Sequence, residues 1–342
     1  MFSLETLQLI IYFVFIGSIV AYATLDGFDL GIGSLHLFAK TDEERRIMIN
    51  AIGPVWDGNT TWIVVGGGVL FAGFPKVFGC LMSGLYTPVM LLIFGFMLRG
   101  AAVEFRSKEK SKKWRQTWDI GFSLASLILA STLGLALGNF IQGLPINAKG
   151  DLEASLIDLL KPYPILVSLF ALSLFMMHGS IFLLMKTEGA FHERVRKWAK
   201  RLIVIFLFFW AMTTATTFTY ADHMVQPIID HPWLSIFALL SVASIGMILH
   251  SIRKGNDGIA FISSCLCIVF LLTLFVVGTF PYFAVSTIDP AYSLTLFNSS
   301  VTRTALLVLT IVSLSGFPLT FFYGAYLYRA FRGKVRLDSL SY

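Results

Sequence analysis

The stretch TLDGFDLGIGSL, residues 24–35, puts two aspartates and three glycines where the first long apolar run of the chain should still be continuing. Asp26 and Asp29 are three residues apart, so on a helix they share one face. The glycines do not form a dinucleotide-binding fingerprint, because that pattern must follow a strand in a βαβ unit, and here the preceding segment is apolar and helical. Carboxylates in a membrane helix tend to face a bundle interior or a water-filled path. The stretch therefore predicts a polar site at the end of the first membrane span.

Composition supports a membrane protein. Of the 342 residues, 56% are hydrophobic and 13% are charged, and the mean hydropathy is +0.77, whereas a soluble domain carries about 25% charged residues. Apolar runs of about 20 residues, the length that crosses a bilayer as a helix, recur along the whole chain. We predict one all-α, polytopic membrane domain over 1–342, with about nine spans. They lie near 5–25 (with a continuation to 36 left open), 53–75, 78–98, 117–138, 163–185, 202–221, 233–250, 259–280 and 302–328.

Lysine and arginine predict the orientation of these spans, because cytoplasmic loops accumulate basic residues. The predicted loops alternate between basic and nearly neutral, and the C-terminal tail is basic. This alternation puts the N-terminus outside and the C-terminus in the cytoplasm, and it accounts for the net charge of +6 without nucleic acid as a partner. Only four basic residues lie on the outer side: Lys76, Lys149, Lys161 and Arg303.

The first cytoplasmic loop contains a helix start signal. Thr41 is followed three residues later by Glu44, the spacing of a capping box, and acidic residues occupy the first turn. We predict a short helix that runs from this signal toward Pro54 and lies at the cytoplasmic interface.

Five acids fall near the cytoplasmic ends of the first four spans. One interpretation is a cytoplasmic proton path, since carboxylates with close like-charged neighbours exchange protons near neutral pH. The alternative is that these acids pair with nearby arginines, for which Arg99, Arg106 and Arg115 are available. The sequence leaves both open. The candidate proton-path residues are Asp26, Asp29, Asp57, Glu104 and Asp119.

Histidine offers a different kind of site. His178 lies within a predicted span, where it could ligate a haem or relay a proton. Bis-histidine ligation needs a second histidine at the same depth, and the other histidines fall near the ends of spans or in loops. We therefore expect His178 to be a hydrogen-bonded histidine of the bundle. The three cysteines lie in apolar runs, and no metal site is predicted.

Several motifs together resemble subunit II of the cytochrome bd-type quinol oxidases. They are TLDGFDLGIGSL (24–35), ERRIMINAIGPVWDGNTTW (44–62), VEFRSK (103–108), WRQTWDIG (114–121), GNFIQGLP (138–145) and YRAFRGKV (328–335). They occur in the family's order and span nearly the full chain. The motif residues, besides the aspartates already named, are Gly27, Phe28, Gly31, Trp56, Gly58, Asn59 and Trp62.

The resemblance implies a nine-helix subunit of a bacterial cytoplasmic (inner) membrane complex that oxidises quinol and reduces oxygen to water. It also implies that haems b and d belong to a homologous partner, subunit I, and that this chain ligates none of them. Subunit II then supports subunit I and is expected to provide a cytoplasmic proton path. Small accessory subunits remain open. From the residues alone, a proton-coupled secondary transporter acting without a haem partner is the alternative.

Overall fold

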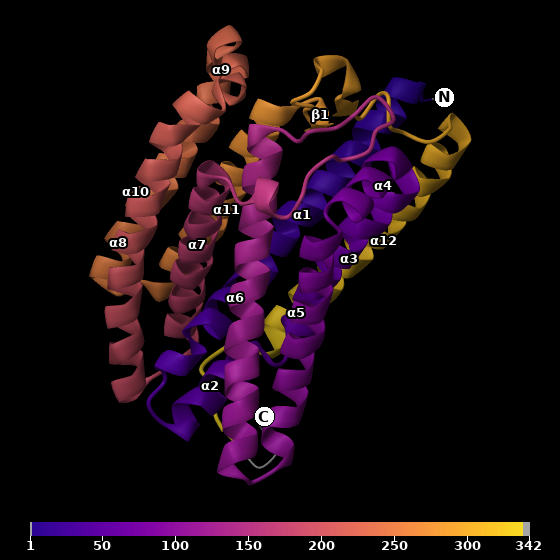
Figure 1. The fold of residues 1–342 in the computed structure, drawn as a ribbon. Helices are drawn as coiled ribbons and strands as arrows, with labels where there is room; N and C mark the ends of the chain where they lie inside the picture. The colour runs from indigo at the N-terminus through magenta and orange to yellow at the C-terminus, as the bar shows by residue number, and fades with distance from the viewer. Residues whose placement is uncertain (1, 338–342) are drawn as a thin grey trace.

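The computed structural model describes residues 2–337 and consists of long helices that run side by side (Figure 1). Eight helices are long and apolar enough to cross a membrane, and a bent pair of shorter helices makes the ninth candidate. The predicted all-α bundle of about nine spans is therefore confirmed. The eight long helices are α1 (Leu4–Leu35), α5 (Tyr86–Phe105), α6 (Lys112–Gln142), α7 (Pro162–Lys186), α8 (Gly189–Tyr220), α10 (Ser235–Lys254), α11 (Asp257–Thr279) and α12 (Arg303–Ala330).

The bent pair corrects one predicted span. Helix α3 (Trp56–Gly73) and helix α4 (Pro75–Gly84) meet at an angle of 117°, so the predicted span 78–98 combines most of α4 with the first part of α5. The break falls at Phe74, because proline cannot continue a helical hydrogen-bond ladder and disfavours helical geometry in the residue before it. Since α4 is itself apolar, hydropathy did not reveal this turn.

Helix α1 is the central helix of the bundle. It continues without a break through the glycines to Leu35, so the longer of the two predicted extents is correct, and it packs against α3, α6, α7, α11 and α12. Two glycines bring α1 and α7 into backbone contact. A Cβ on Gly31 would lie 1.8 Å from the carbonyl oxygen of Phe175, and one on Gly179 would lie 2.7 Å from the backbone nitrogen of Ile32. Small residues allow such close approach of membrane helices.

The short elements lie at the two ends of the bundle. Helix α2 (Asp42–Ile52) starts as predicted, with Thr41 Oγ1 accepting a hydrogen bond from the Glu44 amide at 3.2 Å. At the opposite end, a two-stranded antiparallel sheet joins α11 to α12, and the N-terminus lies nearby (Figure 1). The short elements are β1 (Tyr282–Ala284), β2 (Leu294–Thr295), α9 (Gln226–Asp230) and the 3-10 turns η1 (His36–Phe38), η2 (Arg106–Lys108), η3 (Ile157–Leu159), η4 (Asp222–Met224), η5 (Pro232–Leu234) and η6 (Pro290–Tyr292).

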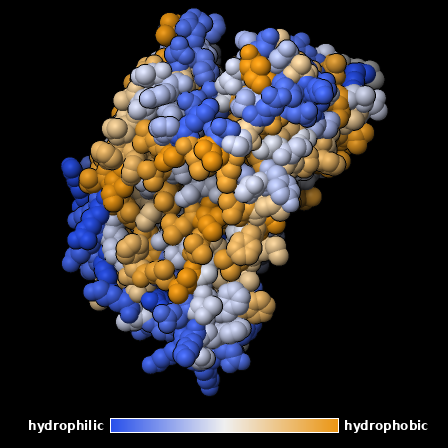
Figure 2. All heavy atoms as spheres, in the orientation of Figure 1, coloured by the Kyte–Doolittle hydropathy of each residue, from blue (hydrophilic) through white to orange (hydrophobic). Residues whose placement is uncertain are grey.

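The surface has the layering of a membrane protein. Figure 2 shows hydrophobic side chains gathered over the middle of the visible face, with hydrophilic side chains at both ends. Large apolar side chains remain exposed along the helices, for example Phe94 on α5 and Phe321 on α12. Such a surface is stable in lipid rather than in water, which agrees with the hydropathy of the sequence.

Candidate functional site

Asp26 is held in an ion pair inside the bundle. The guanidinium of Arg99, on α5, donates to both carboxylate oxygens of Asp26, on α1, at 2.9 and 2.8 Å. The hydroxyl of Thr60, on α3, lies between them, 3.2 Å from Asp26 and 2.6 Å from Arg99. Asp26 is fully buried and Arg99 is 1% exposed. This bidentate geometry joins three helices.

Asp29 lies on the same face of α1 but has different partners. Its Oδ2 accepts a hydrogen bond from Asn59 Nδ2 at 2.9 Å, and Asn59 Oδ1 accepts one from the Tyr328 hydroxyl at 2.8 Å. Asp29 is fully buried, and its Oδ1 has no hydrogen-bond partner among residues 2–337. Within that part of the chain, no lysine, arginine or histidine forms an ion pair with it. Asp29 is therefore a buried carboxyl group with one oxygen available to bind a proton.

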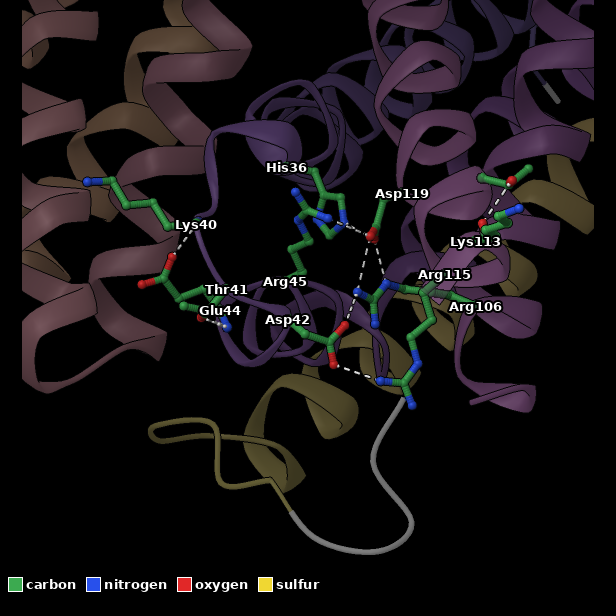
Figure 3. Close-up of polar contacts among 11 residues, drawn as sticks. His36, Lys40, Thr41, Asp42, Glu44, Arg45, Arg106, Lys113, Arg115 and Asp119 are labelled. Carbon is green, nitrogen blue, oxygen red and sulfur yellow. Dashed lines mark hydrogen bonds and ion pairs between the residues drawn. The ribbon is translucent and has the colours of Figure 1, made fainter. Parts of the chain in front are cut away.

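Asp119, on α6, is the centre of a second polar cluster, which Figure 3 shows at the end of the bundle where α2 lies. Its Oδ1 is 2.6 Å from His36 Nε2 and 2.5 Å from Arg106 Nε, and its Oδ2 is 3.0 Å from Arg45 Nη1. Arg106 also donates to Asp42 at 2.8 Å. Asp119 is 1% exposed. With these partners, its carboxylate attaches α2 and the ends of α1 and α5 to α6.

The remaining predicted acids lie apart from the buried pair. Asp57 is in the first turn of α3 and is exposed, and Glu104 is partly exposed near the end of α5. The residues of α3 that do reach Asp26 and Asp29 are Thr60 and Asn59. The five acids are thus distributed over two buried clusters and the surface.

Arg99 and Tyr328 are site residues that the proton-path interpretation missed. The sequence analysis names Arg99 as a possible partner of the acids, and its predicted span 78–98 ends just before this residue. In the structure, Arg99 lies within α5 and bonds to Asp26. In the sequence, Tyr328 is only the first residue of the terminal motif. In the structure, its hydroxyl donates a hydrogen bond to Asn59 from the last helix. For Arg99, the signal was a single arginine at the end of an apolar run. Tyr328 has no comparable signal.

The histidine within the bundle, His178, does not fit an axial ligand of a haem, because both of its ring nitrogens are bonded to the protein. His178 Nδ1 is 2.7 Å from Ser264 Oγ, and its Nε2 donates to the Thr24 carbonyl oxygen at 2.9 Å. His36 is bonded through Nε2 to Asp119. His178 is accordingly the hydrogen-bonded bundle histidine that the sequence predicts. Within residues 2–337, no three histidine, cysteine or acidic side chains come together as a metal site.

The motif residues have packing roles around these clusters. The Phe28 ring stacks on Phe182 with centroids 4.0 Å apart, and Trp62 meets Phe317 edge to face at 4.9 Å. Gly27 leaves room for the ring of Phe175, to which an added Cβ would approach within 2.9 Å. These contacts fix α1 and α3 against their neighbours.

A cavity of about 330 Å³ lies between α3, α12 and the adjoining turn of α1, next to Asn59. Its wall combines apolar side chains with an amide and several hydroxyls. The lining residues are Leu25, Val55, Gly58, Asn59, Thr61, Trp62, Leu319, Thr320, Tyr323, Gly324, Leu327 and Tyr328.

The fold and these clusters define a polytopic helical membrane protein with a buried carboxyl site. Residues 7–331 match the family model described as cytochrome bd terminal oxidase subunit II. The chain belongs to this family, and it is therefore a subunit of a terminal oxidase complex. The alternative of a transporter acting alone is not supported.

Individual relatives agree over nearly the full length. The chain is 28% identical to cytochrome bd-I ubiquinol oxidase subunit 2 of Escherichia coli strain K12, covering 99% of this chain and 98% of the relative. It is 32% identical to cytochrome bd ubiquinol oxidase subunit 2 of Bacillus subtilis, covering 92% and 93%. Its fold is similar to a chain in the structure of bd oxidase from Geobacillus thermodenitrificans, with a TM-score of 0.78, 18% identity, and 95% and 98% coverage.

Proposed function

We propose that this chain pairs with a haem-bearing subunit I in the bacterial inner membrane, in a complex that oxidises quinol and reduces oxygen to water. In this proposal both haems b and d belong to subunit I, and the N-terminus of this chain faces outward. Support comes from family membership, from His178, whose two ring nitrogens are both bonded within the protein, and from the basic loops that predict the orientation.

Reduction of oxygen consumes protons, and we propose that Asp29 carries them through this subunit. The observation that carries this proposal is the contrast within the buried pair. Asp26 is bound on both oxygens by Arg99, whereas Asp29 Oδ1 has no partner among the described residues. A carboxylate paired with a guanidinium stays ionised, while a buried carboxyl group without a cation can bind and release a proton.

The other predicted acids take different parts in this proposal. Asp57 and Glu104, which are at least partly exposed, are placed to collect protons at the cytoplasmic end. Asp119 is bonded to three basic side chains, so its principal part is to hold the cytoplasmic end of the bundle together.

The experiment is oxygen consumption by the assembled complex with Asp29→Asn and Asp57→Asn, measured with a quinol in excess and normalised to haem content. We expect Asp29→Asn to lower the rate by roughly 10²-fold, the lower range for loss of a proton-transferring group. Asp57→Asn should have a smaller effect, because an exposed carboxylate can be replaced by water. A wild-type rate with full haem content in Asp29→Asn would remove Asp29 from the path.

The matched control is Glu5→Gln, in the first turn of α1 at the opposite end of that helix. It removes one carboxylate from the same helix without touching the buried clusters. Its rate should equal that of the wild type. Co-purification of subunit I and a reduced-minus-oxidised haem spectrum test the assembly itself.

A further inference from the structure

We infer that the cavity between α3 and α12 is a hydrated vestibule that supplies protons to Asp29, with Asn59 and Tyr328 as its gate. This inference rests on the proposed role of Asp29 and adds the route and the residues that control it. Only one side chain separates the cavity from the carboxyl group, because Asn59 lines the cavity and also donates to Asp29 Oδ2.

The size and the chemistry of the cavity suit water. A volume of about 330 Å³ has room for several molecules, since each takes about 30 Å³ in the liquid. Polar groups are present on both sides: Thr61 on α3, and Thr320 and Tyr323 on α12. The Thr61 and Thr320 hydroxyls donate to backbone carbonyls of their own helices, which leaves their oxygen lone pairs to accept hydrogen bonds from water.

Helix α12 contains a proline at the edge of this cavity. Pro318 lies inside α12, and the cavity lining on that helix begins at the next residue, Leu319. A proline within a helix removes one backbone hydrogen bond and clashes with the preceding turn, so it bends the helix.

The Asn59 amide is suited to gating because its two ends have different partners. While Asp29 is ionised, Asn59 Nδ2 donates to Asp29 Oδ2 and the Tyr328 hydroxyl donates to Asn59 Oδ1. If a hydronium ion in the vestibule gives its proton to Asp29, one O–H bond breaks in the hydronium ion, one forms on the carboxyl group, and the charge of the carboxylate is neutralised. Where the proton resides on Oδ2, that oxygen becomes a donor.

Rotation of the amide then pairs the carboxyl group and the amide again, and the Tyr328 hydroxyl hydrogen turns to water in the vestibule that Tyr328 lines. The Asn59 Oδ1 turns to accept from Asp29, and Nδ2 turns to donate to the Tyr328 oxygen, since a phenol both donates and accepts hydrogen bonds. Tyr328 thus supports either orientation, and the orientation follows whether Asp29 Oδ2 carries the proton. Phenylalanine in place of Tyr328 removes this support without removing the ring. Asn59 and Tyr328 are positioning residues in this arrangement.

The first experiment tests hydration directly. In the assembled complex in membranes, Thr320→Cys should react with a charged, water-soluble methanethiosulfonate above the background of the three native cysteines. Ser315→Cys, on the exposed apolar side of the same helix, is the control and should not react. An unreactive Thr320→Cys would overturn the vestibule.

The second experiment fills the space. Gly324 lines the cavity, and a Cβ added there meets nothing within 4 Å, so Gly324→Leu introduces a side chain without a clash at its base. Gly316→Leu is the matched control, since Gly316 is outside the lining and its Cβ position is equally open. We expect oxygen consumption per haem to fall roughly tenfold in Gly324→Leu and to stay at the wild-type level in Gly316→Leu. Equal rates in the two variants would overturn the proposal.

The gate has its own readout. Tyr328→Phe should change the pH dependence of oxygen consumption and not only its maximum, because the protonation of Asp29 loses its coupling to the amide. An unchanged pH profile would remove Tyr328 from the gate. Asp29→Asn separates the two levels of inference. If Asp29→Asn consumes oxygen slowly while Gly324→Leu and Tyr328→Phe match the wild type, the proposed vestibule and gate are wrong and the role of Asp29 stands. If Asp29→Asn consumes oxygen at the wild-type rate, the proposed role of Asp29 is wrong.

Discussion

Removal of the Arg99 guanidinium should destabilise this protein more than removal of the whole ion pair. Arg99→Gln deletes two hydrogen bonds to Asp26 and one to Thr60, and it leaves a carboxylate with no exposed surface inside the bundle. Loss of one member of a buried pair costs about 3–5 kcal/mol, because the remaining charge is desolvated without compensation. The double variant Asp26→Asn/Arg99→Gln leaves neither charge of this pair in the bundle and should recover most of that loss.

The assay is equilibrium unfolding of the purified complex in mixed micelles of a mild detergent and SDS, followed for the wild type, both single variants and the double variant. The cycle yields the coupling energy between the two side chains. Arg303→Gln is the matched control, since its guanidinium is exposed and, within residues 2–337, donates only to the Phe2 carbonyl oxygen. This surface change should alter the free energy of unfolding by less than about 0.5 kcal/mol.

Two results would contradict the expected coupling between Asp26 and Arg99. Arg99→Gln with wild-type stability would mean that Asp26 does not depend on its guanidinium. A double variant as unstable as the sum of the single variants would mean that the two side chains act independently. Either result would also undo the contrast between Asp26 and Asp29 on which the proposed proton path depends.

Three other perturbations test separate features. Gly31→Ala should weaken the contact of α1 with α7 by at least about 1–3 kcal/mol, the usual cost of overpacking, because a rigid carbonyl stands 1.8 Å from the new Cβ. Gly67→Ala, inside α3 with open space around its Cβ, should be at least as stable as the wild type. Asp119→Asn should increase hydrogen–deuterium exchange in α2 and in the turns that follow α1 and α5, since one basic group of each loses the shared carboxylate. His178→Gln should leave the haem difference spectrum per complex unchanged, because both ring nitrogens already have protein partners, and a lost haem band would contradict this.

Much of the fold follows from one-dimensional properties of the chain. Membrane thickness sets the length of a span, and the basic loops predict its direction, so nine candidate spans could be counted without any contact being known. The α3–α4 bend was not predicted, because hydropathy depends on composition and carries no information about the direction in which a helix runs. Only the Phe74–Pro75 pair marks the turn.

The site was predictable in part. Asp26 and Asp29 share a helix face by spacing alone, and both are buried as expected for intramembrane acids. Their different partners depend on which side chains other helices bring to the same depth, and sequence spacing carries no such information. Arg99 comes from α5 and Tyr328 from α12, nearly 300 residues after Asp29, so the distinction between an ion pair and a proton-binding group appears only in three dimensions.

The separation of Tyr328 from Asp29 along the chain has a consequence for biosynthesis. The ribosome completes α1 and α3 long before α12, so Asp29 and Asn59 enter the membrane while the phenol that completes their hydrogen bonds has yet to be made. Domains of a growing chain fold in order from the N-terminus, and a contact between the first and last helices must form last. A nascent chain released before α12 therefore keeps an incomplete polar site in its centre.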